Sequence, residues 1–116
     1  MAKKVDVIGT FVFRNEGDGC LTSKYTNSDT PDGPFVEGCK RTSNSIIDLN
    51  DVFRGTYRSE WIEDNRSIEA ELFIERNQNN TRQYILSWYE PNKPNSIIFT
   101  GAGMLFDGLL VGCYWD

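Results

Sequence analysis

The sequence predicts an all-β fold, an antiparallel up-and-down meander of seven to eight strands that closes into a small barrel as one domain, residues 1–116. Three observations support this: apolar residues alternate with polar ones in the second half, turn residues recur at short intervals, and aromatic residues make up 13% of the chain. A chain of this length supports a single domain, since chains split into several only beyond about 200 residues. A β-sandwich is the alternative arrangement of the same strands.

Two consecutive segments carry the clearest alternation. In residues 53–62 the aromatic side chains Phe53, Tyr57 and Trp61 fall at odd positions, between polar residues. In residues 67–76 apolar residues again recur at every second position. This spacing favours strands with one buried face over helices, although Glu, Ala and Leu are good helix formers. Aromatic and β-branched residues predict a further strand over residues 82–90.

The end of the chain reads as a hairpin. Asp107-Gly108 separates two apolar runs, and such a dipeptide favours a two-residue type I′ turn that places Phe106 opposite Leu109. One face of this hairpin carries no charge, and we predict that it faces the core; it consists of Ala102, Met104, Phe106, Leu109, Val111, Cys113 and Trp115. The other face holds Gly101, Gly103, Gly112 and Tyr114. Glycines there indicate curvature, a bulge or close approach of other groups, with Tyr114 covering the gap.

The first half shows weaker signals of the same kind. Partial alternation predicts strands over residues 5–13, 20–25 and 35–41. Residues 27–34 form a loop, because Asn, Ser, Asp, Pro and Gly dominate them. Residues 46–52 form either a short helix or an irregular link.

Large side chains dominate the predicted interior, which leaves two interpretations. An eight-stranded barrel is just wide enough to be filled by side chains or to hold one small ligand. The inward candidates either pack into a solid core or line a pocket. The residues that we select as candidate ligand-binding residues are Tyr57, Trp61, Tyr84, Trp88, Met104 and Trp115.

The strand count, Gly9-Thr10-Phe11, Gly55-Thr56-Tyr57 and the hairpin over residues 101–115 resemble the calycin superfamily. This superfamily comprises lipocalins, fatty-acid-binding proteins and avidins, and the hairpin is similar to those of small bacterial proteins of that kind. Phe11 stands where the lipocalin opening Gly-x-Trp has its tryptophan. The resemblance implies a small apolar or amphipathic ligand in the mouth of the barrel.

Composition argues against several classes of function. With 12 Lys and Arg against 17 Asp and Glu, the net charge is −5, so we expect no nucleic-acid binding. The absence of histidine removes the commonest general base and the usual nucleophile pairs. We therefore expect a non-catalytic binding protein without metal or cofactor; a small enzyme that uses carboxylate, Tyr or Cys groups remains an open alternative.

The sequence also suggests a compartment. No apolar run of about 7–15 residues follows the basic start, and none approaches the about 20 residues of a membrane helix, so we expect a soluble, cytoplasmic chain with no membrane span. The odd number of cysteines then favours reduced thiols at Cys20, Cys39 and Cys113, the last buried on the hairpin. The alternative is an exported protein that has lost a leader and bridges Cys20 to Cys39.

A second functional hypothesis is an interaction or structural module that binds other proteins or forms a homo-oligomer. Its basis is a set of apolar residues on the second faces of the predicted strands. An exposed patch of such residues would mark an interface. The set comprises Phe73, Ile85, Tyr89, Phe99, Leu105 and Leu110.

Overall fold

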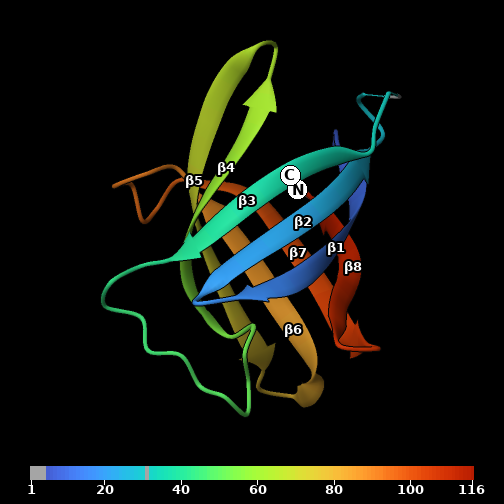
Figure 1. Cartoon of the computed structure of the whole chain (residues 1–116). Helices are drawn as coiled ribbons and strands as arrows, with labels where there is room; N and C mark the ends of the chain where they lie inside the picture. The colour runs from blue at the N-terminus through green and yellow to red at the C-terminus, as the bar shows by residue number, and fades with distance from the viewer. Residues whose placement is uncertain (1–4, 31) are drawn as a thin grey trace.

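The computed structural model describes residues 5–30 and 32–116, so residues 1–4 of the predicted domain and residue 31 of the predicted loop lie outside the described residues. The structure is all-β, and its eight strands close into an antiparallel barrel, as predicted (Figure 1). The strands are β1 (Ile8–Gly17), β2 (Cys20–Asn27), β3 (Phe35–Arg41), β4 (Gly55–Glu63), β5 (Arg66–Asn77), β6 (Asn80–Tyr89), β7 (Ile97–Phe106) and β8 (Leu109–Trp115).

The topology is a simple meander. Each strand pairs with the next, and β1 pairs with β8 to complete the barrel, so that no strand is left with a free edge. Asp107 and Gly108 both have positive φ, 52° and 77°, as a type I′ turn requires. Asp64 and Asn65 between β4 and β5 have the same form, with φ of 51° and 63°.

The two ends of the barrel differ. The upper end in Figure 1 carries the β2–β3 loop and the β4–β5 hairpin, which projects beyond the other strands. The lower end carries the long link between β3 and β4 and the turns after β5 and β7. Residues 46–52 lie in this link and are irregular, which settles the choice left open by the sequence.

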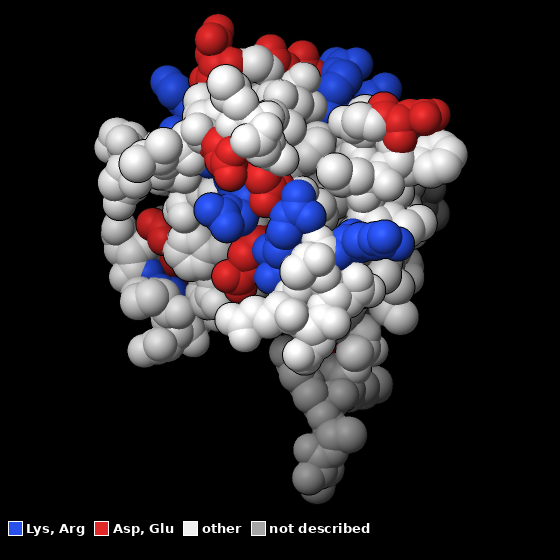
Figure 2. Space-filling model, turned by 90° about the horizontal axis from the view of Figure 1, so that it is seen from below, with Lys and Arg blue, Asp and Glu red and all other residues white. Residues whose placement is uncertain are grey.

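The link closes the lower end because two of its residues are buried there, Phe53 and Asp51. The hydroxyl of Tyr84 donates to Asp51 at 2.5 Å, and Arg76 Nε donates to the same carboxylate at 2.7 Å. The hydroxyl of Tyr57 donates to the carbonyl of Phe53 at 2.8 Å. Figure 2 shows this end from below, where acidic and basic side chains lie side by side. Polar bonds and ring packing thus leave the lower end filled.

The alternation predicted for the second half is confirmed. Positions 70, 72 and 74 of β5 and positions 84, 86 and 88 of β6 are buried, while the residues between them are more exposed. The core consists of Phe11, Phe13, Leu21, Cys39, Phe53, Tyr57, Ala70, Leu72, Ile74, Tyr84, Leu86, Trp88, Leu110 and Tyr114. The strands predicted over residues 5–13, 20–25 and 35–41 correspond to β1, β2 and β3.

The last hairpin has the predicted register but the opposite orientation. Phe106 does pair with Leu109, yet the uncharged face that we predicted to be the core points outward. Met104 is 59% exposed and Phe106 66% exposed, whereas Leu110 on the other face is fully buried. The glycines face inward because the interior is already occupied by large rings. A Cβ on Gly101 would lie 3.2 Å from the ring of Trp88.

The cysteines are all free. Cys113 is exposed, so its predicted burial was wrong for the same reason as that of Met104. Cys39 points into the core and Cys20 away from it, because Cys20 alternates with the buried Leu21. Side chains on opposite faces of the sheet cannot bridge without movement of the backbone.

The apolar residues of the interaction hypothesis do not form one group. Leu110 lies in the core and Phe99 packs against it. Phe73 and Tyr89 are half-buried and contact each other, with ring centroids 5.3 Å apart. Leu105 is 47% exposed near the tip of the last hairpin.

Candidate ligand cavity

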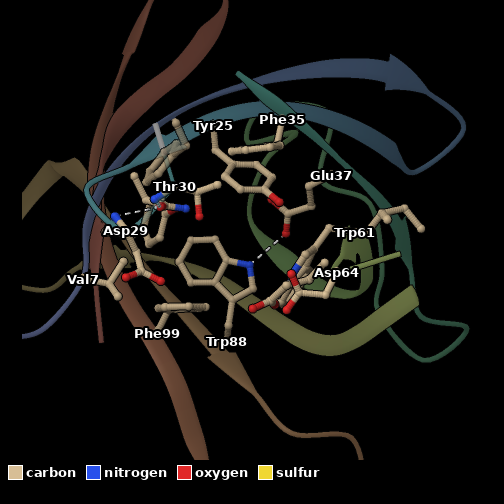
Figure 3. A pocket seen from close by; sticks show the side chains of 15 residues that line it. Val7, Tyr25, Asp29, Thr30, Phe35, Glu37, Trp61, Asp64, Trp88 and Phe99 are labelled. Carbon is tan, nitrogen blue, oxygen red and sulfur yellow. Dashed lines mark hydrogen bonds between the residues drawn. The ribbon is translucent and has the colours of Figure 1, made fainter. Parts of the chain in front are cut away.

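A cavity of about 260 Å³ opens at the upper end of the barrel (Figure 3). It lies where β2, β4, β6 and β8 end and where β1, β3 and β7 begin. An engineered protein cavity of about 150 Å³ holds benzene, so this volume admits a ligand with one or two rings. Its aromatic lining consists of Phe11, Tyr25, Phe35, Trp61, Trp88, Phe99 and Tyr114.

Trp88 is central to the aromatic lining. Its ring lies 6.2 Å from that of Phe11, 6.5 Å from that of Phe99 and 6.0 Å from that of Tyr114, centroid to centroid. The contacts with Phe11 and Phe99 are edge-to-face and the contact with Tyr114 is tilted. Edge-to-face contacts add about 0.5–1.5 kcal/mol beyond the burial of area. The rings therefore hold one another, and this wall of the cavity is formed before any ligand arrives.

Tyr114 has room because glycines stand beside it on both neighbouring strands. It pairs with Gly9 of β1 and with Gly101 of β7. A Cβ on Gly9 would lie 2.3 Å from the Tyr114 ring, so no larger residue fits there while the ring keeps its place. Its hydroxyl accepts from Asn27 Nδ2 at 3.2 Å and donates to the carbonyl of Thr26 at 3.2 Å. These bonds fix the ring at the mouth.

Glu37 places a carboxyl group at the inner end of the cavity. The residue is only 4% exposed, and Trp88 Nε1 donates to its Oε2 at 2.9 Å (Figure 3). The hydroxyl of Ser59 on β4 donates to the same oxygen. Ser23 of β2 is the cross-strand neighbour of Glu37 and is fully buried.

Burial changes the titration of the groups around this carboxyl. Desolvation raises the pKa of Glu37, and the hydrogen-bonding side chains around it, Ser59, Trp88, Ser23 and Cys39, only partly offset this effect. Burial, followed by the negative field of Glu37, raises the pKa of Tyr25 to about 12. The pKa of Tyr114 is raised mainly by burial. Both phenols therefore stay neutral at physiological pH and offer O–H groups rather than charge.

Further carboxylates lie toward the opening. Glu63 and Asp64 come from the projecting β4–β5 hairpin, and Asp29 comes from the β2–β3 loop. Trp61 Nε1 donates to Glu63 Oε2 at 3.4 Å. The cavity thus combines an apolar, aromatic wall with a few acceptors, an arrangement typical of small-molecule sites.

The structure separates the six candidate binding residues into three groups. Trp61 and Trp88 line the cavity. Tyr57 and Tyr84 face inward at the lower end, where their hydroxyls bind the β3–β4 link. Met104 and Trp115 belong to the outward face of the last hairpin and do not line the cavity. Ligand binding by any of the six stays a prediction.

Sequence reasoning missed much of the lining. Glu37 had a usable signal, since it shares one parity with Phe35 and Cys39 in a predicted strand and is an acid on an otherwise apolar side. Tyr25 and Phe35 lie at strand ends beside the loop, where alternation alone does not indicate a pocket. Tyr114 was missed because it stands on the face that we assigned to the outside.

The fold and the cavity define a closed eight-stranded antiparallel barrel with an aromatic pocket at one end. No family model, curated protein or solved structure matches the chain, so the calycin resemblance holds at the level of barrel architecture. Within residues 5–30 and 32–116, no helix is both long and apolar enough to cross a membrane.

Proposed function

We propose that this protein binds a small amphipathic ligand, without catalysis, in the cavity at the upper end of the barrel. The observation that carries the proposal is the preformed aromatic cavity of about 260 Å³ around Trp88 and Trp61. The aromatic side chains that line this opening leave ring surface without protein packing partners, and the apolar body of a bound ligand can cover that surface. A binding role explains why rings fill the lower end and leave the upper end open.

The calycin-like architecture supports the same proposal. An eight-stranded barrel that side chains do not fill completely can hold one small ligand, and the mouths of β-barrels are a common place for binding sites. We infer that the chain is calycin-like in this functional sense as well as in its strand arrangement. The ligand has an apolar body that contacts the rings and a polar group that meets Glu37 or the phenols.

Tryptophan fluorescence tests the proposal, because two of the three tryptophans line the cavity and Trp115 does not. We use para-nitrobenzyl alcohol, a neutral one-ring amphiphile whose nitro group quenches indole. We expect saturable quenching with one site per chain. Trp61→Ala removes a wall and weakens binding about tenfold, which corresponds to about 1.4 kcal/mol.

Trp115→Phe is the matched control, since it removes an indole outside the cavity and leaves the affinity unchanged. Quenching that rises linearly without saturation contradicts the proposal. So does a Trp61→Ala variant that is folded and binds as tightly as the original chain.

A further inference from the structure

We propose that the cavity selects organic cations: ligands with an ammonium group on a small apolar body, the ammonium against Glu37 and the body among the rings. This inference rests on the proposed function and adds the charge of the ligand. Three independent features of the cavity support it: the negative charge of its lining, the capacity of Glu37 to accept further hydrogen bonds, and the faces of its aromatic rings.

The lining has one sign of charge. It contains the four acidic residues Asp29, Glu37, Glu63 and Asp64, and no Lys or Arg is among the described residues that line it. The chain as a whole carries a net charge of −5. A cleft lined by one sign of charge attracts ligands of the opposite sign and repels those of its own. Anionic amphiphiles, such as fatty acids, are therefore disfavoured in this cavity.

Glu37 is a buried acid with no cationic partner in the part of the chain that the structure describes. The ion pairs among the described residues are Arg14–Glu16, Arg76–Asp51 and Lys93–Glu90, and none of them includes Glu37. Trp88 and Ser59 both donate to Oε2, which leaves the carboxylate with further capacity to accept. A buried carboxylate that lacks a counter-charge is costly, so a bound cation offsets a cost that the empty barrel already carries.

Ser23 provides a second polar group at the same place. Its Oγ is buried beside Glu37, and within the part of the chain that the structure describes it makes no hydrogen bond of standard geometry, although it lies close enough to Glu37 to lower the pKa of that carboxyl. It lies directly across from Glu37 on the neighbouring strand. A hydroxyl oxygen and a carboxylate side by side match the several N–H donors of one ammonium group.

The aromatic lining suits the same ligand. A cation near the face of Trp or Tyr is attracted by the ring quadrupole, by about 0.5–2 kcal/mol depending on desolvation. The cavity offers Trp61, Trp88, Tyr25 and Tyr114, and the two phenols are neutral at physiological pH, since the ordinary tyrosine pKa of 10.0 is raised further by burial. An ammonium among these rings is also close to the carboxylate that balances its charge.

Calorimetric titration with three ligands of similar size tests the inference: phenethylamine as the cation, phenethyl alcohol as the neutral form, and hydrocinnamate as the anion. We expect the amine to bind about ten- to a hundredfold more tightly than the alcohol, and the anion not to bind. Glu37→Gln abolishes the preference for the amine and retains alcohol binding. Glu75→Gln, on the outer face of β5, changes neither affinity.

A second variant, Trp61→Leu, keeps an apolar side chain in the cavity wall but loses the ring face. It tests the preference for cations if Glu37→Gln does not fold. We expect it to reduce amine affinity more than alcohol affinity. Equal affinities for amine and alcohol in the original chain overturn the inference and leave the proposed function standing. If the preference for the amine over the alcohol instead persists in Glu37→Gln and disappears in high salt, it comes from the carboxylates near the opening, and the role of Glu37 is overturned. These carboxylates are Asp29, Glu63 and Asp64. Failure of all three ligands to bind overturns the proposed function itself.

Discussion

At the scale of single residues, Glu37 is the least expected feature. A carboxyl group that is 4% exposed is held by two neutral donors, Ser59 and Trp88, in an otherwise apolar interior. Neutral donors offset desolvation only in part, so its pKa is raised. The residue therefore costs stability when it is ionised. Buried groups with shifted pKa values are common at functional sites, which agrees with the role proposed for Glu37.

The raised pKa of Glu37 predicts how stability depends on pH. Its folded pKa lies above its ordinary value of 4.5, so its stabilising contribution is complete below pH 4.5 and is lost as pH rises through the folded pKa. Glu37→Gln cannot ionise and lacks this loss. Urea unfolding across acidic to neutral pH checks this. The gap between the two proteins should widen by up to about 1.4 kcal/mol per pH unit in that window, in favour of the variant.

The titratable groups next to Glu37 should not ionise between acidic and neutral pH, so they do not disturb this measurement. The groups whose pKa is coupled to Glu37 are Cys39 on its own strand, Tyr25 on β2 and Tyr114 on β8, and burial raises the pKa of all three. Glu75→Gln on the outer face is the control and should follow the original chain at every pH. If the stability difference between Glu37→Gln and the original chain does not change with pH, folding does not shift the pKa of Glu37, and the prediction is wrong.

At the scale of elements, the last hairpin determines the shape of the interior. Gly101 and Gly103 of β7 face inward and leave space for the rings of Phe11 and Trp88, which come from other strands. In a barrel of eight strands the interior is too narrow for large residues on every inward position. Small residues on β7 therefore compensate for large ones on β1 and β6.

Gly103→Ala tests this compensation. A Cβ there would lie 2.7 Å from the carbonyl oxygen of Val111 and 3.3 Å from the ring of Phe11, so strand or ring must shift. We expect a loss of about 1–3 kcal/mol in the free energy of unfolding, measured with urea. Gly38→Ala, on the exposed face of β3 with nothing within 4 Å of the added Cβ, is the control. It should be neutral or stabilise the fold by up to about 1 kcal/mol.

Alternation and turn chemistry were sufficient to predict the strands and their order, because the strands have one buried and one exposed face and most of the connections between them are short. They were not sufficient to orient the last hairpin. Both of its faces lack charge, and the face with larger side chains was the natural choice for a core. The actual orientation depends on rings contributed by other strands, Trp88 of β6 and Phe11 of β1, and β1 is distant in sequence. The sequence indicated a possible aromatic cavity that includes Trp61 and Trp88. It did not indicate that this cavity lies at one end of the barrel.

At the scale of the whole molecule, the barrel divides into a closed end and an open end. The β3–β4 link closes one end through Phe53 and the Asp51 carboxylate, which Tyr84 and Arg76 bind. Burial acts to raise the pKa of Asp51, but the hydrogen bonds from Arg76 and Tyr84 outweigh it and the pKa is lowered. The acid at this end is therefore matched by a cation, whereas Glu37 at the open end forms no ion pair within residues 5–30 and 32–116. The buried acids at the two ends therefore differ in their electrostatic surroundings, which agrees with the proposed binding role of the open end.

The indole N–H signals of the three tryptophans, recorded by nitrogen–proton correlation NMR during titration with phenethylamine, test this account most directly. Trp61→Phe, Trp88→Phe and Trp115→Phe assign the signals. Since Trp88 Nε1 donates to Glu37 and Trp61 lines the same cavity, both signals should shift together and saturate at one ligand per chain. The Trp115 signal should stay in place. A titration that moves only the Trp115 signal, or none, contradicts a ligand cavity at the open end of the barrel.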